Sequence, residues 1–282
     1  MIRLCVMLAI VPLAAASSAL EEAGALYQRT EYRKALSILL AAEPKNAPIH
    51  ALIGQCYYGL EDFKKATEAL ERAVEADPQN SHYADWLGKA YGRRAETASI
   101  LTAPSHASKA RKYFEQAVEL DPQNQDAVDD LFDYYLEAPG LLGGGQDKAS
   151  ALAERLRERN PTKYHTMQAR LAEKRKQLQE AEKHWRLAVE SAPSETGRLA
   201  SLAKFLARQG RFAESEEVFE KADRSAPENV RLKFERAKTY VESRRNLGQA
   251  RKLLEEYLKY SLTPDDPPRS EAQRLLEKAV RS

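Results

Sequence analysis

The sequence is poor in the residues that build metal centres, disulfides and nucleophile motifs. Its 282 residues include two cysteines and five histidines. No Cys-x-x-Cys, His-Glu-x-x-His or Gly-x-Ser-x-Gly motif is present. We therefore expect no enzymatic activity, no metal and no cofactor. The histidines, each interpreted as a partly buried helix residue without a ligand partner, are His50, His82, His106, His165 and His184.

Neither sign of charge dominates the composition. The chain has 44 Lys and Arg against 42 Asp and Glu, although residues 1–149 sum to −6 and residues 150–282 to +8. Opposite charges alternate along the chain, as in Glu180-Ala-Glu-Lys183, which is typical of solvated, salt-bridged helix faces. There is also no interleaved aromatic array on which single-stranded nucleic acid would stack. We expect no nucleic-acid partner.

Charge is nearly absent from the N-terminus, where Arg3 precedes an apolar run over residues 4–16. The basic start, the short apolar run and the small residues after it predict a secretory signal peptide over residues 1–19, cleaved after Ala16 or Ala19. The run is too short to span a bilayer. The alternatives are an uncleaved anchor and a first helix of the folded protein.

The two cysteines neither support nor contradict export. Cys5 lies inside the apolar run and not at its end, so we expect no lipid attachment. Once the signal is removed, Cys56 is the only thiol, and it cannot form an internal disulfide. Its helical surroundings predict a small buried apolar residue. We predict an exported protein, periplasmic or extracellular, without a transmembrane segment after cleavage.

Proline recurs along the chain at nearly even spacing. Seven of the 13 prolines lie 32 to 44 residues apart, and most of them close a segment of helical character. A period of this length predicts a repeat solenoid, in which each unit buries its core against its neighbours. These prolines are Pro44, Pro78, Pro122, Pro161, Pro193, Pro227 and Pro264.

The clearest unit spans residues 47–80. In its second half, small and apolar residues recur every three or four positions and so share one face of a helix. The pattern of the whole unit resembles the tetratricopeptide repeat. The matching residues are Gly54, Tyr57, Ala66, Leu70, Ala73 and Pro78. A second unit matches at Leu87, Gly88, Tyr91, Ala110, Phe114, Ala117 and Pro122.

Looser units extend the resemblance over residues 20–264. It implies an all-α fold, a right-handed superhelical solenoid of antiparallel helix pairs with about seven repeats. Residues 265–282 are predicted to form a C-terminal capping helix, because apolar residues form one stripe on a charged segment. The stripe comprises Ala272, Leu275, Leu276, Ala279 and Val280.

Two insertions interrupt the period, near residues 93–108 and 137–146. The first favours helix as far as Leu101, which predicts an extended first helix. The second contains Pro139 and four glycines, which predict a loop. It lacks the leading strand and the Gly-Lys-Ser/Thr ending of a phosphate-binding loop, so we interpret it as a flexible connector. Both insertions fall in the turn inside a helix pair, and so on the same edge.

An acidic strip lies between the insertions. Its five carboxylates fall at i, i+3, i+4, i+7 and i+11, and so on one helix face. It is either a solvated face or a site for a basic or hydroxyl-rich ligand or a cation, and a hard cation would need further oxygen ligands from elsewhere. The strip comprises Asp126, Asp129, Asp130, Asp133 and Glu137.

In the tetratricopeptide family the first helix of each pair lines a concave groove. The residues that the resemblance assigns to this groove, as candidates for partner binding, are Asp85, Lys89, Arg93, Asp129, Asp133, Glu137, Arg170, Lys204 and Arg208. The carboxylate clamp of the co-chaperone members is not matched, because Ala51 and Gln55 occupy two of its positions.

We therefore predict an exported scaffold or adaptor that binds a segment of another protein in the groove, in envelope assembly or secretion. One alternative is a solenoid that binds a glycan or small ligand through the acidic strip, the glycine-rich loop and three tyrosines. Exposure of those rings would favour it, and their burial would exclude it. They are Tyr58, Tyr134 and Tyr135. The other alternative is a cytosolic or membrane-anchored scaffold that keeps its N-terminus.

Overall fold

A computed structural model describes residues 10–281, and all regular structure in that range is helical. The first nine residues of the predicted signal peptide lie outside it. The helices are α1 (Ile10–Gln28), α2 (Tyr32–Ala41), α3 (Ala47–Gly59), α4 (Phe63–Ala76), α5 (Ser81–Thr97), α6 (Ala103–Leu120), α7 (Gln125–Glu137), the 3₁₀ turn η1 (Gly140–Leu142), α8 (Gln146–Glu154), α9 (Pro161–Lys174), α10 (Leu178–Ser191), α11 (Thr196–Arg208), α12 (Phe212–Ser225), α13 (Val230–Ser243), α14 (Leu247–Tyr257) and α15 (Arg269–Arg281).

The chain divides into two compact units, the first ending at Gly145 and the second beginning at Gln146. Unit 1 holds the packed pairs α1/α2, α3/α4 and α5/α6, followed by α7. Unit 2 begins with α8 and holds the pairs α9/α10, α11/α12 and α13/α14, closed by α15. The two units thus hold six packed pairs, three in each, together with α7, α8 and α15, and the predicted all-α solenoid is confirmed.

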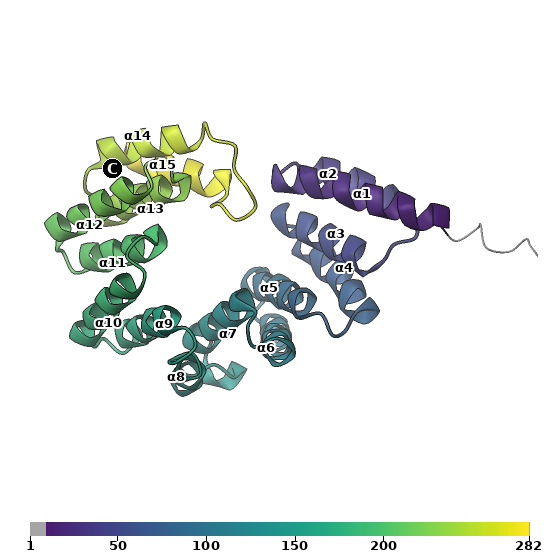
Figure 1. Ribbon diagram of the computed structural model, residues 1–282, viewed down its shortest axis with the longest axis horizontal. Coiled ribbons are helices and arrows are strands. Elements are labelled where there is room, and N and C mark those ends of the chain that lie inside the picture. Colours follow the sequence, from purple (N-terminus) through teal and green to yellow (C-terminus); the bar gives the residue numbers. More distant parts are fainter. Residues whose placement is uncertain (1–9, 282) are drawn as a thin grey trace, which may run out of the picture. The chain divides into compact units, whose positions relative to one another are not determined.

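First helices of successive pairs pack against one another throughout unit 1 and, in unit 2, from α11 onward. In unit 1, α3 contacts α1 and α5, and α5 contacts α7; in unit 2, α13 contacts α11 and α15 (Figure 1). Side chains on these helices therefore form one continuous surface in each unit, where residues of neighbouring repeats can act together. No described helix is long and apolar enough to cross a membrane.

Asparagine side chains start five of these first helices. Each accepts a hydrogen bond from the backbone N–H three positions later, which satisfies a donor that the helix itself leaves free. Four of the five follow a proline by two residues, so the recurring prolines end one helix just before the next is capped. The caps are Asn46, Asn80, Asn124, Asn160 and Asn229.

Glycines let the two helices of a pair approach closely. A Cβ atom on Gly54 would lie 2.5 Å from Leu70 Cγ, and one on Gly88 would lie 2.6 Å from the ring of Phe114. The predicted inward face of α4 is confirmed, since Leu70 is fully buried. Cys56 is also fully buried, as predicted, and burial raises the pKa of its thiol to about 12. This thiol is therefore unreactive at neutral pH.

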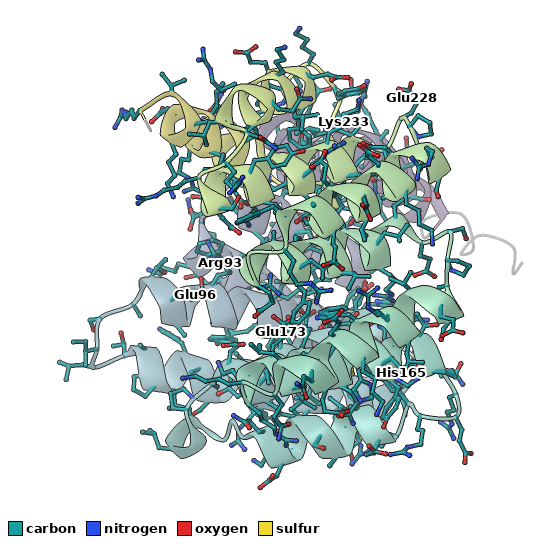
Figure 2. The ribbon with its side chains drawn as sticks, turned by 90° about the vertical axis from the view of Figure 1, so that its left-hand side faces the viewer. Arg93, Glu96, His165, Glu173, Glu228 and Lys233 are labelled. Carbon is teal, nitrogen blue, oxygen red and sulfur yellow. The ribbon has the colours of Figure 1, made fainter. Side chains whose placement is uncertain are left out.

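The first insertion lengthens both helices of its pair, to 17 residues in α5 and 18 in α6. The sequence predicts helix as far as Leu101, whereas α5 ends at Thr97 and a tight turn follows. At its tip, Ile100 and Leu101 are each 91% exposed. In Figure 2 this turn reaches outward past the helix ends.

The second insertion is more ordered than the predicted flexible connector. It contains the 3₁₀ turn η1, and Tyr134 Oη donates a 2.8 Å hydrogen bond to the Leu142 carbonyl. Gly144 is required there, because a Cβ atom would lie 1.9 Å from the carbonyl oxygen of Ala138. The glycine content of this segment predicts flexibility, but the hydroxyl of Tyr134 on α7 holds the loop in place.

Candidate partner-binding surface of the first helices

Three charged side chains from α5 and α7 meet in unit 1. Lys89 Nζ lies 2.8 Å from Asp85 Oδ2 on the same helix and 3.0 Å from Asp130 Oδ2 on α7. The Asp85 side chain is buried, whereas those of Lys89 and Asp130 are 22% and 30% exposed. With both carboxyls ionised, Asp85 Oδ1 has no hydrogen-bond donor among the described residues. We call these three residues the α5–α7 cluster.

Burial sets the protonation of the α5–α7 cluster. It raises the pKa of Asp130 to about 7 and also raises the pKa of Asp85, in both cases against the attraction of Lys89. Burial alone would lower the pKa of Lys89, but Asp130 and Asp85 hold that pKa above its ordinary value. The two carboxyls therefore share one proton near neutral pH, while Lys89 stays charged.

Aromatic rings border the cluster. Lys89 Nζ lies 5.0 Å from the centre of the Trp86 ring, and Tyr58 meets Trp86 edge-on at 5.5 Å. Farther along α5, Arg93 pairs with Glu96 and lies 5.1 Å from the ring of Phe63. Both members of that ion pair are labelled in Figure 2. The half-buried rings of Trp86 and Tyr58 give the surface an apolar border beside its charges.

The acidic strip on α7 does not act as one group. Asp126, Asp129 and Glu137 are exposed and Asp133 is half-buried, whereas Asp130 faces Lys89. The predicted groove set includes the neighbouring Asp129 in place of Asp130. Only contact with α5 distinguishes the two positions, and helix periodicity alone does not supply that information.

Two of the three predicted groove residues of unit 2 lie in cross-helix ion pairs. Arg208 on α11 lies 2.6 Å from Glu173 on α9, and Lys204 on α11 lies 2.7 Å from Glu235 on α13. A third pair, Lys238 with Glu271, joins α13 to α15 at 2.9 Å. We call these pairs the unit 2 ladder, and Figure 2 labels Glu173 within it. The remaining predicted residue, Arg170, is half-buried on α9.

The tyrosines proposed for a glycan site form no exposed stack. All three rings are half-buried. Tyr135 Oη donates a 2.9 Å hydrogen bond to Glu115 on α6, and Tyr134 is tied to the η1 loop, so both rings serve the packing inside unit 1. Tyr58 packs against Phe63 and Trp86.

Two of the five histidines contact each other, which the sequence did not indicate. His165 on α9 and His184 on α10 lie with their Nδ1 atoms 3.0 Å apart, and burial lowers the pKa of each. The pair is therefore neutral near pH 7, with one imidazole donating to the other. The described residues hold no group of three or more potential metal ligands, here or elsewhere. Nothing in the spacing of 19 residues pointed to this contact.

Family profiles described as tetratricopeptide repeat match residues 14–90, 106–124 and 166–230. Among curated proteins, the anaphase-promoting complex subunit 3 of Dictyostelium discoideum is 39% identical over 61 residues, which is 21% of this chain. The match spans only 6% of that relative's length.

Solved structures share the fold at low identity. A tetratricopeptide repeat protein from Parabacteroides merdae superposes with a TM-score of 0.60 at 15% identity, over 95% of this chain and 99% of that one. A thermophilic tetratricopeptide repeat protein of Thermus thermophilus gives 0.53 at 20% identity, over 67% and 98%. The pilF protein of Pseudomonas aeruginosa gives 0.52 at 18% identity, over 78% and 96%. The repeat matches and the helical architecture together identify the chain as a tetratricopeptide-repeat protein.

Proposed function

We propose that this chain is an exported scaffold that binds a segment of another protein along the first helices of unit 1. The helical-repeat fold is consistent with an interaction scaffold. The observation that carries the proposal is the α5–α7 cluster, where two carboxyls face the single ammonium group of Lys89 beside half-buried aromatic rings. The Asp130 carboxylate, 30% exposed, connects this buried charge to the surface, where a cationic group of a ligand can reach it.

The corresponding surface of unit 2 differs. Its predicted residues Lys204 and Arg208 are already neutralised by carboxylates of neighbouring helices. Both pairs are partly exposed, so separating either would cost up to about 1 kcal/mol, which a new contact must first offset. We therefore assign the partner to unit 1, and we propose that charge pattern sets the register of the bound segment.

A crosslinking pulldown from the native compartment tests this function. The variant Asp129→Lys/Asp133→Lys reverses two charges on α7 beside the α5–α7 cluster. Glu68→Lys/Glu75→Lys makes the same change on α4, where both glutamates are exposed, and serves as the matched control. We expect the α7 variant to lose partners that the α4 variant keeps. Identical partner sets for wild type and both variants would exclude this surface.

Export is tested separately. The basic start and short apolar run of the N-terminus support it. N-terminal sequencing of the mature protein from its native host should give a first residue of Ser17 or Leu20. A mature chain that begins at Met1 would favour the cytosolic or anchored alternative, without affecting the assignment of the binding surface.

A further inference from the structure

We propose that the α5–α7 cluster is a receptor for a single lysine or arginine side chain of the bound segment, and that this cation takes the place of a proton. This inference rests on the proposed scaffold function and specifies the chemistry of its partner. It starts from the charge balance. Asp85 and Asp130 bring two carboxyls to one ammonium group, Lys89, so one negative charge in a largely buried site has no protein cation.

The groups facing the cluster do not provide that cation. They are Tyr58 from α3, Arg93 and Glu96 from α5, and Asp126 from α7. Arg93 is engaged by Glu96, and Asp126 adds negative charge. A buried charge without a partner is costly, and proteins normally avoid that cost by binding a proton or an opposite charge. Here a proton is held near neutral pH, and a ligand cation would serve the same purpose.

Geometry favours an amino-acid cation over a metal ion. The described residues bring together no set of three metal-ligating side chains. A hard divalent cation requires six or more oxygen ligands, and the α5–α7 cluster has too few of them. An ammonium or guanidinium group needs only two or three acceptors. The Asp130 carboxylate, 30% exposed, offers its oxygens to such a group, and the buried Asp85 carboxyl adds negative charge behind it.

The aromatic border suits the stem of such a side chain. Trp86 already has Lys89 Nζ 5.0 Å from its ring centre, so the ring lies where a cation is attracted. Tyr58 stands edge-on to Trp86 at 5.5 Å, and both rings are half-buried. The methylene groups of a lysine or arginine can pack on these rings while the charged end reaches the carboxyls.

The site itself is tested with a small cation on the full-length protein. The carboxyl ¹³C resonances of the aspartates are followed by NMR from pH 5 to 9, in n-butylammonium chloride or in sodium chloride of equal ionic strength. We expect n-butylammonium to lower the apparent pKa of the Asp85/Asp130 pair, and Asp130→Asn to abolish this response. An equal pKa in both salts would overturn the proposal.

The partner chemistry is tested with peptides selected from a random displayed library on the wild-type protein. We expect a recurring Lys or Arg whose replacement by norleucine abolishes binding. One linked proton with a pKa near 7 predicts about tenfold tighter binding at pH 8 than at pH 6. Asp130→Asn should remove this pH dependence, while Glu119→Gln on the outer helix α6 should keep it. Circular dichroism confirms that both variants are folded.

The two experiments separate the inference from the function on which it rests. Selected peptides without a basic residue, or with pH-independent affinity, would refute the cation receptor and leave the scaffold in place. Failure to select any peptide would refute the scaffold function, whereas the response to n-butylammonium would still decide whether the cluster accepts a cation.

Discussion

Asn124 Nδ2 donates a 2.7 Å hydrogen bond to Ser81 Oγ, across 43 residues of sequence. Asn124 Oδ1 also accepts from the backbone N–H of Ala127, which caps α7, and Ser81 Oγ donates to the Ala117 carbonyl at 2.9 Å. Two side chains thus join the start of α5, the end of α6 and the start of α7. This junction holds α5 and α7 in the relative position on which the α5–α7 cluster depends.

Ser81→Ala should destabilise unit 1. The change leaves Asn124 Nδ2 and the Ala117 carbonyl without their buried partner, which typically costs about 1–3 kcal/mol. Urea unfolding followed by Trp86 fluorescence, in a Trp185→Phe background, measures the loss. Ser108→Ala, on an exposed position of α6, is the control and should change the free energy of unfolding by less than about 0.5 kcal/mol.

Two glycines on α5 should respond oppositely to alanine. Gly88→Ala places a methyl group 2.6 Å from the buried ring of Phe114, and overpacking of this kind costs about 1–3 kcal/mol. A methyl group on Gly92 would meet no side chain or neighbouring helix of the described chain within 4 Å, so Gly92→Ala should stabilise the helix by about 0.5–1 kcal/mol. Thermal unfolding of the two variants tests this. Equal effects would contradict the close approach of α5 and α6.

The stability of unit 1 should fall as pH rises from about 4 to 7. Burial raises the folded-state pKa of Asp130 to about 7, above its ordinary value of 3.8, so the folded state binds more protons than the unfolded state in this window. The slope of unfolding free energy against pH is therefore negative there and levels off above pH 7. Asp130→Asn should reduce this dependence of the unfolding free energy on pH. Hydrogen exchange of α5 and α7 amides measures it, and a wild-type slope retained in the variant would contradict the assignment.

Unit 2 should lose stability on acidification through the His165/His184 pair. Burial lowers the pKa of both imidazoles from 6.5, so the unfolded state takes up protons first as pH falls below 6.5. The positive charges of Arg157 and Lys183 oppose protonation of the two imidazoles. The negative charges of Glu154 and Glu180 favour it.

His184→Gln should reduce this acid sensitivity, because one ionisable partner is removed. Trp185 fluorescence during urea unfolding at pH 5 and pH 7 gives the comparison, in a Trp86→Phe background. His82→Gln, on an exposed position of unit 1, should leave the pH response of unit 2 unchanged. An unaltered response in His184→Gln would show that other groups carry it.

Local periodicity was sufficient to predict the helix pairs and their inward faces. Ala66 and Leu70 are fully buried because spacing along one helix fixes which face packs. Contacts between helices could not be predicted from the sequence in the same way. The contacts of Asp130 and of the histidine pair depend on which neighbouring helix each residue meets. On α7, Asp130 belongs to the α5–α7 cluster, whereas Asp129, one position earlier, is exposed. The end of α5 at Thr97 was also missed, since propensity alone extends the helix to Leu101.

The unit 2 ladder has a mechanical consequence. Its three links join α9 to α11, α11 to α13 and α13 to α15, so every bend between consecutive repeats of this unit stretches or compresses an ion pair. Each pair is at least partly exposed and so is weakened by dissolved salt, which screens charges over about 8 Å at physiological ionic strength. A rise in salt concentration should therefore weaken these three links between consecutive repeats of unit 2.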